Sequence, residues 1–158
     1  MNELTIKKIA VLGSGIMGSR IALHLAGAGF KVLLLDLCAD SNLPVTETSS
    51  RNQLVNDALE AALRSNPSPV YHKSVRSHVQ TGNFSDNLPD IATCDWIIEV
   101  VVERLDVKQQ LYANIEQYRK PGTLISTNTS GIPLSLLSEG RSDDFRRNFC
   151  RSEEHTSE

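Results

Sequence analysis

The sequence predicts an α/β fold built on a doubly wound parallel sheet. Short apolar runs that suit buried strands alternate along the chain with segments of helical periodicity, which is typical of such a sheet. Hydrophobic residues make up 40% of the 158 residues and aromatic residues only 5%, which favours an aliphatic α/β interior over a β-sandwich. The length is that of about one domain and is sufficient to bury a core.

A strand–turn–helix–strand unit opens the chain and runs from Lys7 to Asp36. Residues 9–12 form a short apolar run, as expected of a parallel strand that is buried on both faces. A helix is expected to begin near Ile16, and a second strand over residues 31–35 ends at the acid.

Three glycines between this first strand and this first helix have the spacing G-x-G-x-x-G. Gly13 allows the tight turn, Gly15 lets a pyrophosphate approach the backbone, and Gly18 lets the helix pack closely on the strand. The first N–H groups of the helix carry roughly half a positive charge and point at the phosphates. The predicted phosphate-binding residues are Gly13, Ser14, Gly15, Ile16, Met17 and Gly18.

The acid after the second strand indicates which dinucleotide cofactor binds. Asp36 follows the glycines at about 20 residues, where a carboxylate accepts hydrogen bonds from an adenosine ribose. The next residues, Leu37, Cys38 and Ala39, include no Arg or Lys to receive a 2′-phosphate. The glycine pattern alone could mark an ordinary turn, but here it has the required strand–turn–helix–strand–acid context. The sequence therefore predicts a Rossmann-type domain that binds NAD rather than NADP.

A helical insertion is expected between the second and third strands. Residues 41–50 are polar and aperiodic and predict a loop, and Leu54 with the alanines that follow it predicts a helix that ends at Asn66 and Pro67. Residues 67–74 predict a proline-bearing surface connection, and residues 75–81 a short third strand that Gly82 closes.

Strands and helices continue to alternate in the second half of the chain. In order, the patterns predict a short helix or turn over 86–92, a strand over 96–102, an amphipathic helix over 105–118, a strand over 123–126, a short helix opened by Pro133, and the approach to a sixth strand over 145–150. Glu99 interrupts the strand over 96–102, either as a satisfied acid or as a ligand-binding one. Asp36, Glu103 and residues 128–130 all follow strands, and ligands of such sheets bind outside the carboxyl ends of the strands.

Charge and cysteine content indicate which classes of partner and which redox compartment to expect. The net charge of -3 does not favour a nucleic-acid surface, and no apolar run approaches the ~20 residues of a membrane helix. Cys38, Cys94 and Cys150 form no C-x-x-C pair and predict reduced, mostly buried thiols. We expect a cytoplasmic protein with no metal site and with neither nucleic acid nor membrane as a partner.

The chain resembles the NAD-binding domain of the 3-hydroxyacyl-CoA dehydrogenases of fatty-acid β-oxidation. The resemblance covers residues 5–150 and rests on the motifs VLGSGIMG, LLLD, DWIIEVVVE, PGTLISTNTSG and EGRSDDFRRNFC. The inserted helix and the segment PSPVYHKS favour the long bacterial form, in which the dehydrogenase precedes an enoyl-CoA hydratase region. The resemblance implies that the chain is a fragment whose C-terminal domains are missing. It also allows a homodimer of the full-length enzyme.

The resemblance also implies roles for particular residues. Glu103 and Lys108 match a Glu and a Lys that contact the cofactor, in addition to the glycine turn and Asp36. Ser130 matches a catalytic serine that touches both the nicotinamide and the substrate, and Asn128 matches the asparagine of the same turn. Arg20 departs from the family, which has a small residue there, and would either reach a phosphate or crowd the packing.

The general base of the family is a histidine in a G-T-H-F-F-N-P segment directly after the position of Cys150. Here residues 151–158 read RSEEHTSE, which resembles the in-frame translation of a common sequencing adapter. We therefore expect an NAD-binding domain over 1–150, a non-native tail over 151–158 and no role for His155 as the base. A chain without that segment and without the substrate domain is expected to be inactive.

The resemblance implies the oxidation of an (S)-3-hydroxyacyl-CoA by NAD to the 3-oxoacyl-CoA and NADH. A base removes the hydroxyl proton while a hydride passes to the nicotinamide. Two alternatives are a β-hydroxyacid dehydrogenase-type NAD(P) enzyme, which shares a G-x-G-x-M-G turn, and a non-catalytic NAD-binding module. The absence of an Arg beside Asp36 and the N-T-S turn count against the first.

Overall fold

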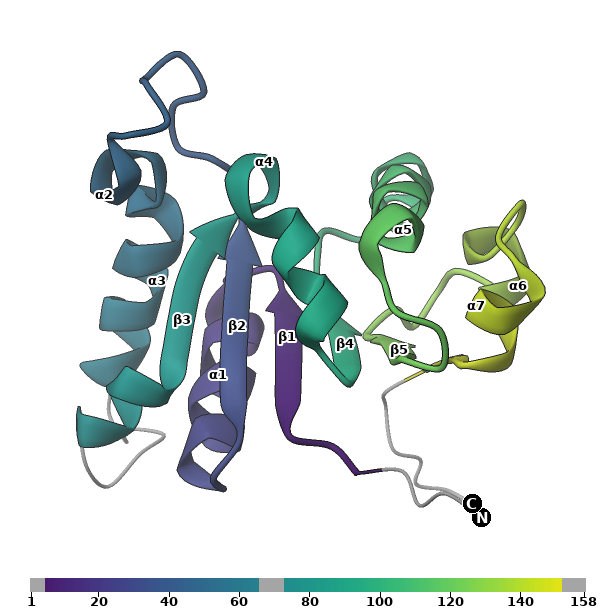
Figure 1. The fold of residues 1–158 in the computed structure, drawn as a ribbon, viewed down its shortest axis with the longest axis horizontal. Coiled ribbons are helices and arrows are strands. Elements are labelled where there is room, and N and C mark those ends of the chain that lie inside the picture. Colours follow the sequence, from purple (N-terminus) through teal and green to yellow (C-terminus); the bar gives the residue numbers. More distant parts are fainter. Residues whose placement is uncertain (1–4, 66–72, 152–158) are drawn as a thin grey trace.

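Six parallel strands form one sheet in the computed structural model, which describes residues 5–65 and 73–151 (Figure 1). The strand order is β3-β2-β1-β4-β5-β6. The strands are β1 (Lys8–Leu12), β2 (Lys31–Asp36), β3 (Val79–Asn83), β4 (Trp96–Glu99), β5 (Leu124–Thr127) and β6 (Phe149–Arg151). This is the doubly wound Rossmann order that the sequence predicts, and the direction of winding reverses between β1 and β4. Within the described residues, every helix is too short or too polar to cross a bilayer.

Helices cover both faces of the sheet. On one face lie α1 (Ile16–Gly27) and α3 (Gln53–Leu63), and on the other lie η2 (Leu88–Thr93) and α5 (Leu105–Tyr118), as Figure 1 shows. The shorter helices are α2 (Thr48–Arg51), α4 (Phe84–Asn87), α6 (Leu134–Leu137), α7 (Asp143–Arg147) and the 3-10 helix η1 (Lys73–His78).

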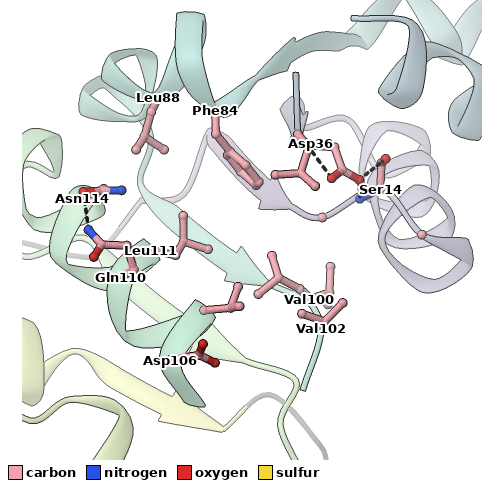
Figure 2. A pocket seen from close by; sticks show the side chains of 15 residues that line it. Ser14, Asp36, Phe84, Leu88, Val100, Val102, Asp106, Gln110, Leu111 and Asn114 are labelled. Carbon is pink, nitrogen blue, oxygen red and sulfur yellow. Dashed lines mark hydrogen bonds between the residues drawn. The ribbon is translucent and has the colours of Figure 1, made fainter. Parts of the chain in front are cut away.

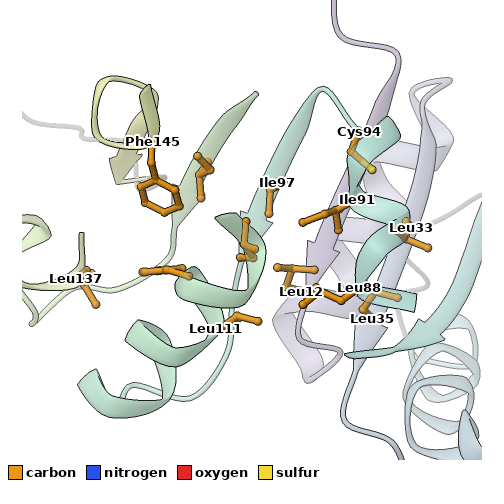
Figure 3. Close-up of a cluster of buried hydrophobic side chains, with 14 residues drawn as sticks. Leu12, Leu33, Leu35, Leu88, Ile91, Cys94, Ile97, Leu111, Leu137 and Phe145 are labelled. Carbon is orange, nitrogen blue, oxygen red and sulfur yellow. The ribbon is translucent and has the colours of Figure 1, made fainter. Parts of the chain in front are cut away.

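The central strand β1 supplies side chains to both hydrophobic clusters, one on each face of the sheet. Because successive side chains of a strand point to opposite faces, Ala10 and Leu12 lie in the cluster under η2 and α5 (Figure 3), whereas Ile9 and Val11 lie under α1 and α3. All four side chains are fully buried. The continuous apolar run at the start of the chain therefore encodes a strand covered on both sides, as predicted.

The third strand differs from its prediction. Residues 73–78 form η1, and β3 begins only at Val79 and continues through Gly82 to Asn83. Gly82 does not close the strand. A Cβ at Gly82 would lie 2.6 Å from Oδ1 of Asn87, so the glycine allows the following helix α4 to pack against the strand end.

The inserted helix exists, but of its predicted apolar face only Ala62 is buried. Val55, Leu59 and Leu63 are buried, whereas Leu54 is 42% exposed and Ala61 is exposed. The loop before it is also shorter than predicted, because α2 begins at residue 48. The helix ends at Leu63, earlier than the predicted end at residues 66–67. The predicted connection over residues 67–72 lies outside the described residues.

The fourth strand ends at Glu99, not at residue 102. Its neighbours end at the same level, because Glu99 pairs with Leu12 of β1 on one side and with Thr127 of β5 on the other. Residues 100–102 therefore leave the sheet, although their sequence is β-prone.

The last strand is also displaced from its prediction. Phe145 is a buried residue of α7, and β6 covers only residues 149–151. Arg151, which was expected to be outside the domain, is the last residue of β6 and donates hydrogen bonds to the carbonyl oxygens of Thr129 (2.7 Å) and Ile132 (3.4 Å). Cys150 is exposed, so the expectation of mostly buried thiols is wrong at this position; among the others, Cys94 is buried and Cys38 half-buried.

Candidate cofactor site

The three glycines of the first turn meet different surroundings. Gly13 has a φ of 111°, and a Cβ there would lie 2.7 Å from the carbonyl oxygen of Val100. A Cβ at Gly18 would lie 1.8 Å from the carbonyl oxygen of Gly13, so α1 can pack on the turn only without a side chain at this position. A Cβ at Gly15 would meet nothing within 4 Å. Gly13 and Gly18 are therefore required by the fold, whereas Gly15 borders open space that suits a pyrophosphate.

The N-terminus of α1 points into this space. Gly15 is its N-cap residue, so no side chain caps the helix, and the first turn contains no acid. Ile16 is 86% exposed and Met17 is also exposed. A helix start of this kind offers backbone N–H groups and a partial positive charge to a phosphate.

Asp36 is oriented by the glycine turn. Its Oδ2 accepts hydrogen bonds from the backbone N–H of Ser14 (2.7 Å) and from the Ser14 hydroxyl (Figure 2). Its Oδ1 accepts one from the backbone N–H of Leu37 at 2.7 Å. A carboxylate has about four acceptor positions, so Asp36 retains capacity for a ribose hydroxyl.

A cavity of about 830 Å³ lies at the carboxyl ends of β1, β2 and β4 and includes Gly13, Ser14, Gly15 and Asp36 in its wall (Figure 2). The size is within the usual range of small-molecule sites. The rest of the wall is largely apolar, with three polar residues from α5, and consists of Leu37, Phe84, Leu88, Val100, Val101, Val102, Asp106, Val107, Gln110, Leu111 and Asn114. Sequence reasoning missed most of these residues, because they come from separate segments and share no motif.

The N-T-S turn, residues 128–130, lies on the side of the start of α1 that is opposite to Asp36. Nδ2 of Asn128 is 2.7 Å from Sδ of Met17. Asn128, Ser130, Glu103 and Lys108 do not line the 830 Å³ cavity. The predicted site residues therefore form two groups, one around Asp36 and one around residues 128–131, with the glycine turn and the first residues of α1 between them.

Glu103 holds the N-T-S turn. Its Oε2 accepts hydrogen bonds from Oγ1 of Thr129 (2.5 Å) and from the backbone N–H groups of Ser130 (3.2 Å) and Gly131 (3.1 Å). The Thr129 hydroxyl and these N–H groups hold the pKa of Glu103 below its ordinary value. The carboxylate is half-exposed, so a ligand can still reach it.

Lys108 and Glu99 form a buried ion pair beneath that turn. Nζ of Lys108 lies 2.6 Å from Oε2 of Glu99 and 3.6 Å from Oε1 of Glu103, and the side chain is 1% exposed. Glu99 is therefore a satisfied acid within the strand, which resolves the two alternatives left by the sequence. The predicted contact of Lys108 with the cofactor stays a prediction, because its ammonium group is enclosed here.

Arg20 is a residue of α1, and its side chain extends to Ser65, just after the end of α3. Its Nη1 donates a hydrogen bond to Oγ of Ser65 at 2.9 Å, and it lines a second cavity of about 430 Å³ with Ala58 and Ala61.

Within residues 5–65 and 73–151, no group of three or more His, Cys, Asp or Glu side chains could hold a metal ion.

The fold and the site together define a dinucleotide-binding domain of the Rossmann class, because the strand order, the glycine turn and the acid at the end of β2 occur in their required places. The sequence profile of the NAD binding domain of 3-hydroxyacyl-CoA dehydrogenase matches residues 8–149. The chain belongs to this family, and its cofactor is NAD.

Several relatives agree with this assignment. A probable 3-hydroxyacyl-CoA dehydrogenase of Bacillus subtilis is 43% identical over 91% of the chain, and another of Deinococcus radiodurans is 40% identical over 92%. The chain spans only 19% and 40% of the lengths of these two proteins. The dehydrogenase part of multifunctional enzyme 1 from C. elegans has the same fold, with a TM-score of 0.69, 24% identity and coverage of 91% of this chain and 30% of that one.

Proposed function

We propose that the chain is the cofactor-binding part of an enzyme that oxidises an (S)-3-hydroxyacyl-CoA to the 3-oxoacyl-CoA. The observation that carries the proposal is the position of the N-T-S turn beside the start of α1, next to the glycine turn that suits the phosphates. A substrate held at residues 128–130 would thus lie close to the far end of a dinucleotide whose adenosine lies at Asp36.

Each part of the cofactor has a proposed partner in this chain. The N–H groups at the start of α1 bind the phosphates, Asp36 accepts hydrogen bonds from the adenosine ribose, and the apolar cavity wall around Phe84 and Leu88 receives the adenine. When bound, NAD supplies the acceptor for the two electrons that leave the alcohol carbon. The half-exposed carboxylate of Glu103 is available to the second ribose.

Ser130 and Asn128 are proposed to position the reacting hydroxyl group of the substrate. Ser130 is exposed, and its backbone N–H is held by Glu103, so its hydroxyl is presented from a fixed main chain. Such positioning brings the reacting groups together and lowers the entropic part of the barrier. The proton of the substrate hydroxyl goes to a histidine base that the G-T-H-F-F-N-P segment of the family would supply.

We further propose that the 158-residue chain alone has no turnover. None of its four histidines has the sequence context of the family base, and losing a general base typically costs about 10²–10⁴-fold in rate. The assay follows NADH absorbance with acetoacetyl-CoA as substrate. Turnover that disappeared in His155→Ala would contradict the proposal, because the histidine of the RSEEHTSE segment would then act as the base.

The activity itself is tested in a chimera. Residues 1–150 replace the corresponding domain of the Bacillus subtilis relative, of whose length this chain spans only 19%, so the chimera contains the rest of that longer protein. The chimera is expected to reduce acetoacetyl-CoA with NADH, and Ser130→Ala to lower kcat by at least about 10-fold. Ser135→Ala, at an exposed serine of α6, is the matched control. A folded chimera that binds NADH but shows no turnover would instead support a non-catalytic NAD-binding module.

A further inference from the structure

Glu99 is a fully buried carboxylate at the end of the central strand β4. Four donors surround it, which is close to the acceptor capacity of a carboxylate. Oε2 accepts from Nζ of Lys108 (2.6 Å) and the backbone N–H of Val101 (2.7 Å). Oε1 accepts from Oγ1 of Thr127 (2.5 Å) and from the hydroxyl of Tyr112. Its side chain is 0% exposed.

A buried ion pair is a costly way to hold a core together. Taking two charges out of water costs several kcal/mol each, and well-packed apolar residues are often as stabilising. The hydroxyls of Tyr112 and Thr127 and the ion pair with Lys108 are aimed at one carboxylate from α5 and β5. This arrangement fixes the mutual placement of three segments and suits a positioning role better than a purely stabilising one.

Two connections lead from Glu99 to the N-T-S turn. The first runs along the strand ends. The carbonyl oxygen of Glu99 accepts a hydrogen bond from the backbone N–H of Asn128 (3.0 Å). Oγ1 of Thr127 donates a hydrogen bond to Glu99 and accepts one from the backbone N–H of Thr129 (3.2 Å). The second runs through Lys108, whose ammonium group lies between the carboxylates of Glu99 and Glu103.

The second connection ends at the turn itself. Oε2 of Glu103 accepts hydrogen bonds from Thr129, Ser130 and Gly131. Because Oε1 of Glu103 lies beside Nζ of Lys108, the Glu103 carboxylate connects the turn with the buried Glu99–Lys108 pair. Val101, whose backbone N–H binds Glu99, also lines the cavity around Asp36, but Glu99, Lys108, Thr127, Glu103 and residues 128–131 do not. Residues 129–131 are hydrogen-bonded within this network, whereas the hydrogen bonds described for Asp36 come from Ser14 and Leu37.

Residues 128–131 lie at the half of the cofactor site that the adenosine does not occupy. A dinucleotide lies across the point where the strand order reverses, with its pyrophosphate at the glycine turn. Since Asp36 ends β2 on one side of that point, the second nucleotide half must extend toward the ends of β4 and β5, where residues 128–131 lie.

We propose that Glu99 is a positioning residue for the nicotinamide half of NAD, acting through Thr127 and through Lys108 and Glu103 on residues 128–131. The proposal rests on the cofactor site described above, and it separates the two ends of that site. Loss of the Glu99 charge releases the turn and weakens contacts with the nicotinamide end, whereas the adenosine end keeps its partners.

The test compares NADH with ADP, which carries only the adenosine and the two phosphates. In Glu99→Gln we expect the Kd for NADH, measured by calorimetry or fluorescence, to rise about 10-fold, corresponding to about 1.4 kcal/mol. The Kd for ADP is expected to change by less than about 2-fold. The control is Ser126→Ala on the neighbouring strand β5, because the Ser126 hydroxyl accepts a hydrogen bond from Nε1 of Trp96 (3.0 Å) and does not contact Glu99.

Three outcomes contradict different statements. A folded Glu99→Gln variant with unchanged NADH affinity, or with equal losses for NADH and ADP, would overturn the positioning role. A wild-type chain that bound neither ligand would instead contradict the cofactor site itself. If Glu99→Gln does not fold, Tyr112→Phe removes one donor and keeps the ion pair; it must show the same selective loss for NADH, and equal losses would overturn the proposal.

Discussion

The carboxylate of Asp36 accepts hydrogen bonds from both the backbone N–H and the hydroxyl of Ser14. The residue that ends β2 is therefore joined to the glycine turn that follows β1. A ligand whose phosphates lie at that turn has its adenosine ribose beside this carboxylate, so the same contact that shapes the turn also presents the group that distinguishes cofactors.

The first prediction concerns that choice. The wild-type chain is expected to bind NADH more tightly than NADPH, because a 2′-phosphate would face Asp36 as a like charge. Asp36→Ala should weaken NADH binding and narrow the difference between the two cofactors, as measured by fluorescence titration. Asp40→Ala, in the exposed loop that follows, is the control and should keep the wild-type preference. Equal affinities in the wild type would show that Asp36 does not select the cofactor.

A second prediction concerns Gly15. The open space beside it means that Gly15→Val can fold, and its φ of -58° suits any residue. The new side chain would occupy the space of the pyrophosphate, so NADH binding should be lost while the far-UV circular dichroism spectrum stays as in the wild type. Wild-type affinity in this variant would mean that no phosphate approaches the turn at this point.

Gly18 should behave in the opposite way. A Cβ at Gly18 would lie 1.8 Å from the carbonyl oxygen of Gly13, so Gly18→Ala must displace α1 from the turn. Overpacking of this kind costs typically about 1–3 kcal/mol of unfolding free energy, to be measured by urea denaturation. Gly27→Ala in the same helix has no atom within 4 Å of the new Cβ and should be neutral or stabilising. Equal stabilities of the two variants would contradict the close contact at Gly18.

The fourth prediction concerns the loop after β2. Arg51 lies 2.8 Å from Asp86 and also donates to the carbonyl oxygen of Leu43 (2.6 Å), so the pair holds the loop against α4. Hydrogen bonds from Arg51 and, to a smaller extent, from Asn83 lower the pKa of Asp86 to about 2. Because the pKa is lower in the folded state, this stabilisation is present above the unfolded pKa and is lost as the pH falls toward 2.

The measurement is the unfolding free energy between pH 4 and pH 2. Asp86→Asn should lose less stability than the wild type over this interval, because it has no carboxylate to protonate. Arg51→Gln should flatten the profile in the same way, since the pKa of Asp86 then returns toward its ordinary value. A wild-type slope in both variants would rule out the pair as a source of acid sensitivity.

The sequence alone determined the elements whose signal is local. The apolar runs of β1 and β2, the start of α1 at Ile16 and both ends of α5 were predicted correctly. Each depends on neighbouring residues: a continuous apolar run, glycines at fixed spacing, or a helical period between a polar start and a Pro-Gly stop. The family and the cofactor also follow from these short motifs.

Tertiary structure alone decided where the strands stop and what the polar side chains contact. β4 ends at Glu99 because β1 and β5 end beside it, which no pattern within residues 96–102 expresses. The burial of Lys108 and the tie between Glu103 and residues 129–131 likewise require segments distant in sequence to meet. Hydrogen bonding and burial at these positions depend on partners brought together by the sheet, so local sequence cannot specify them.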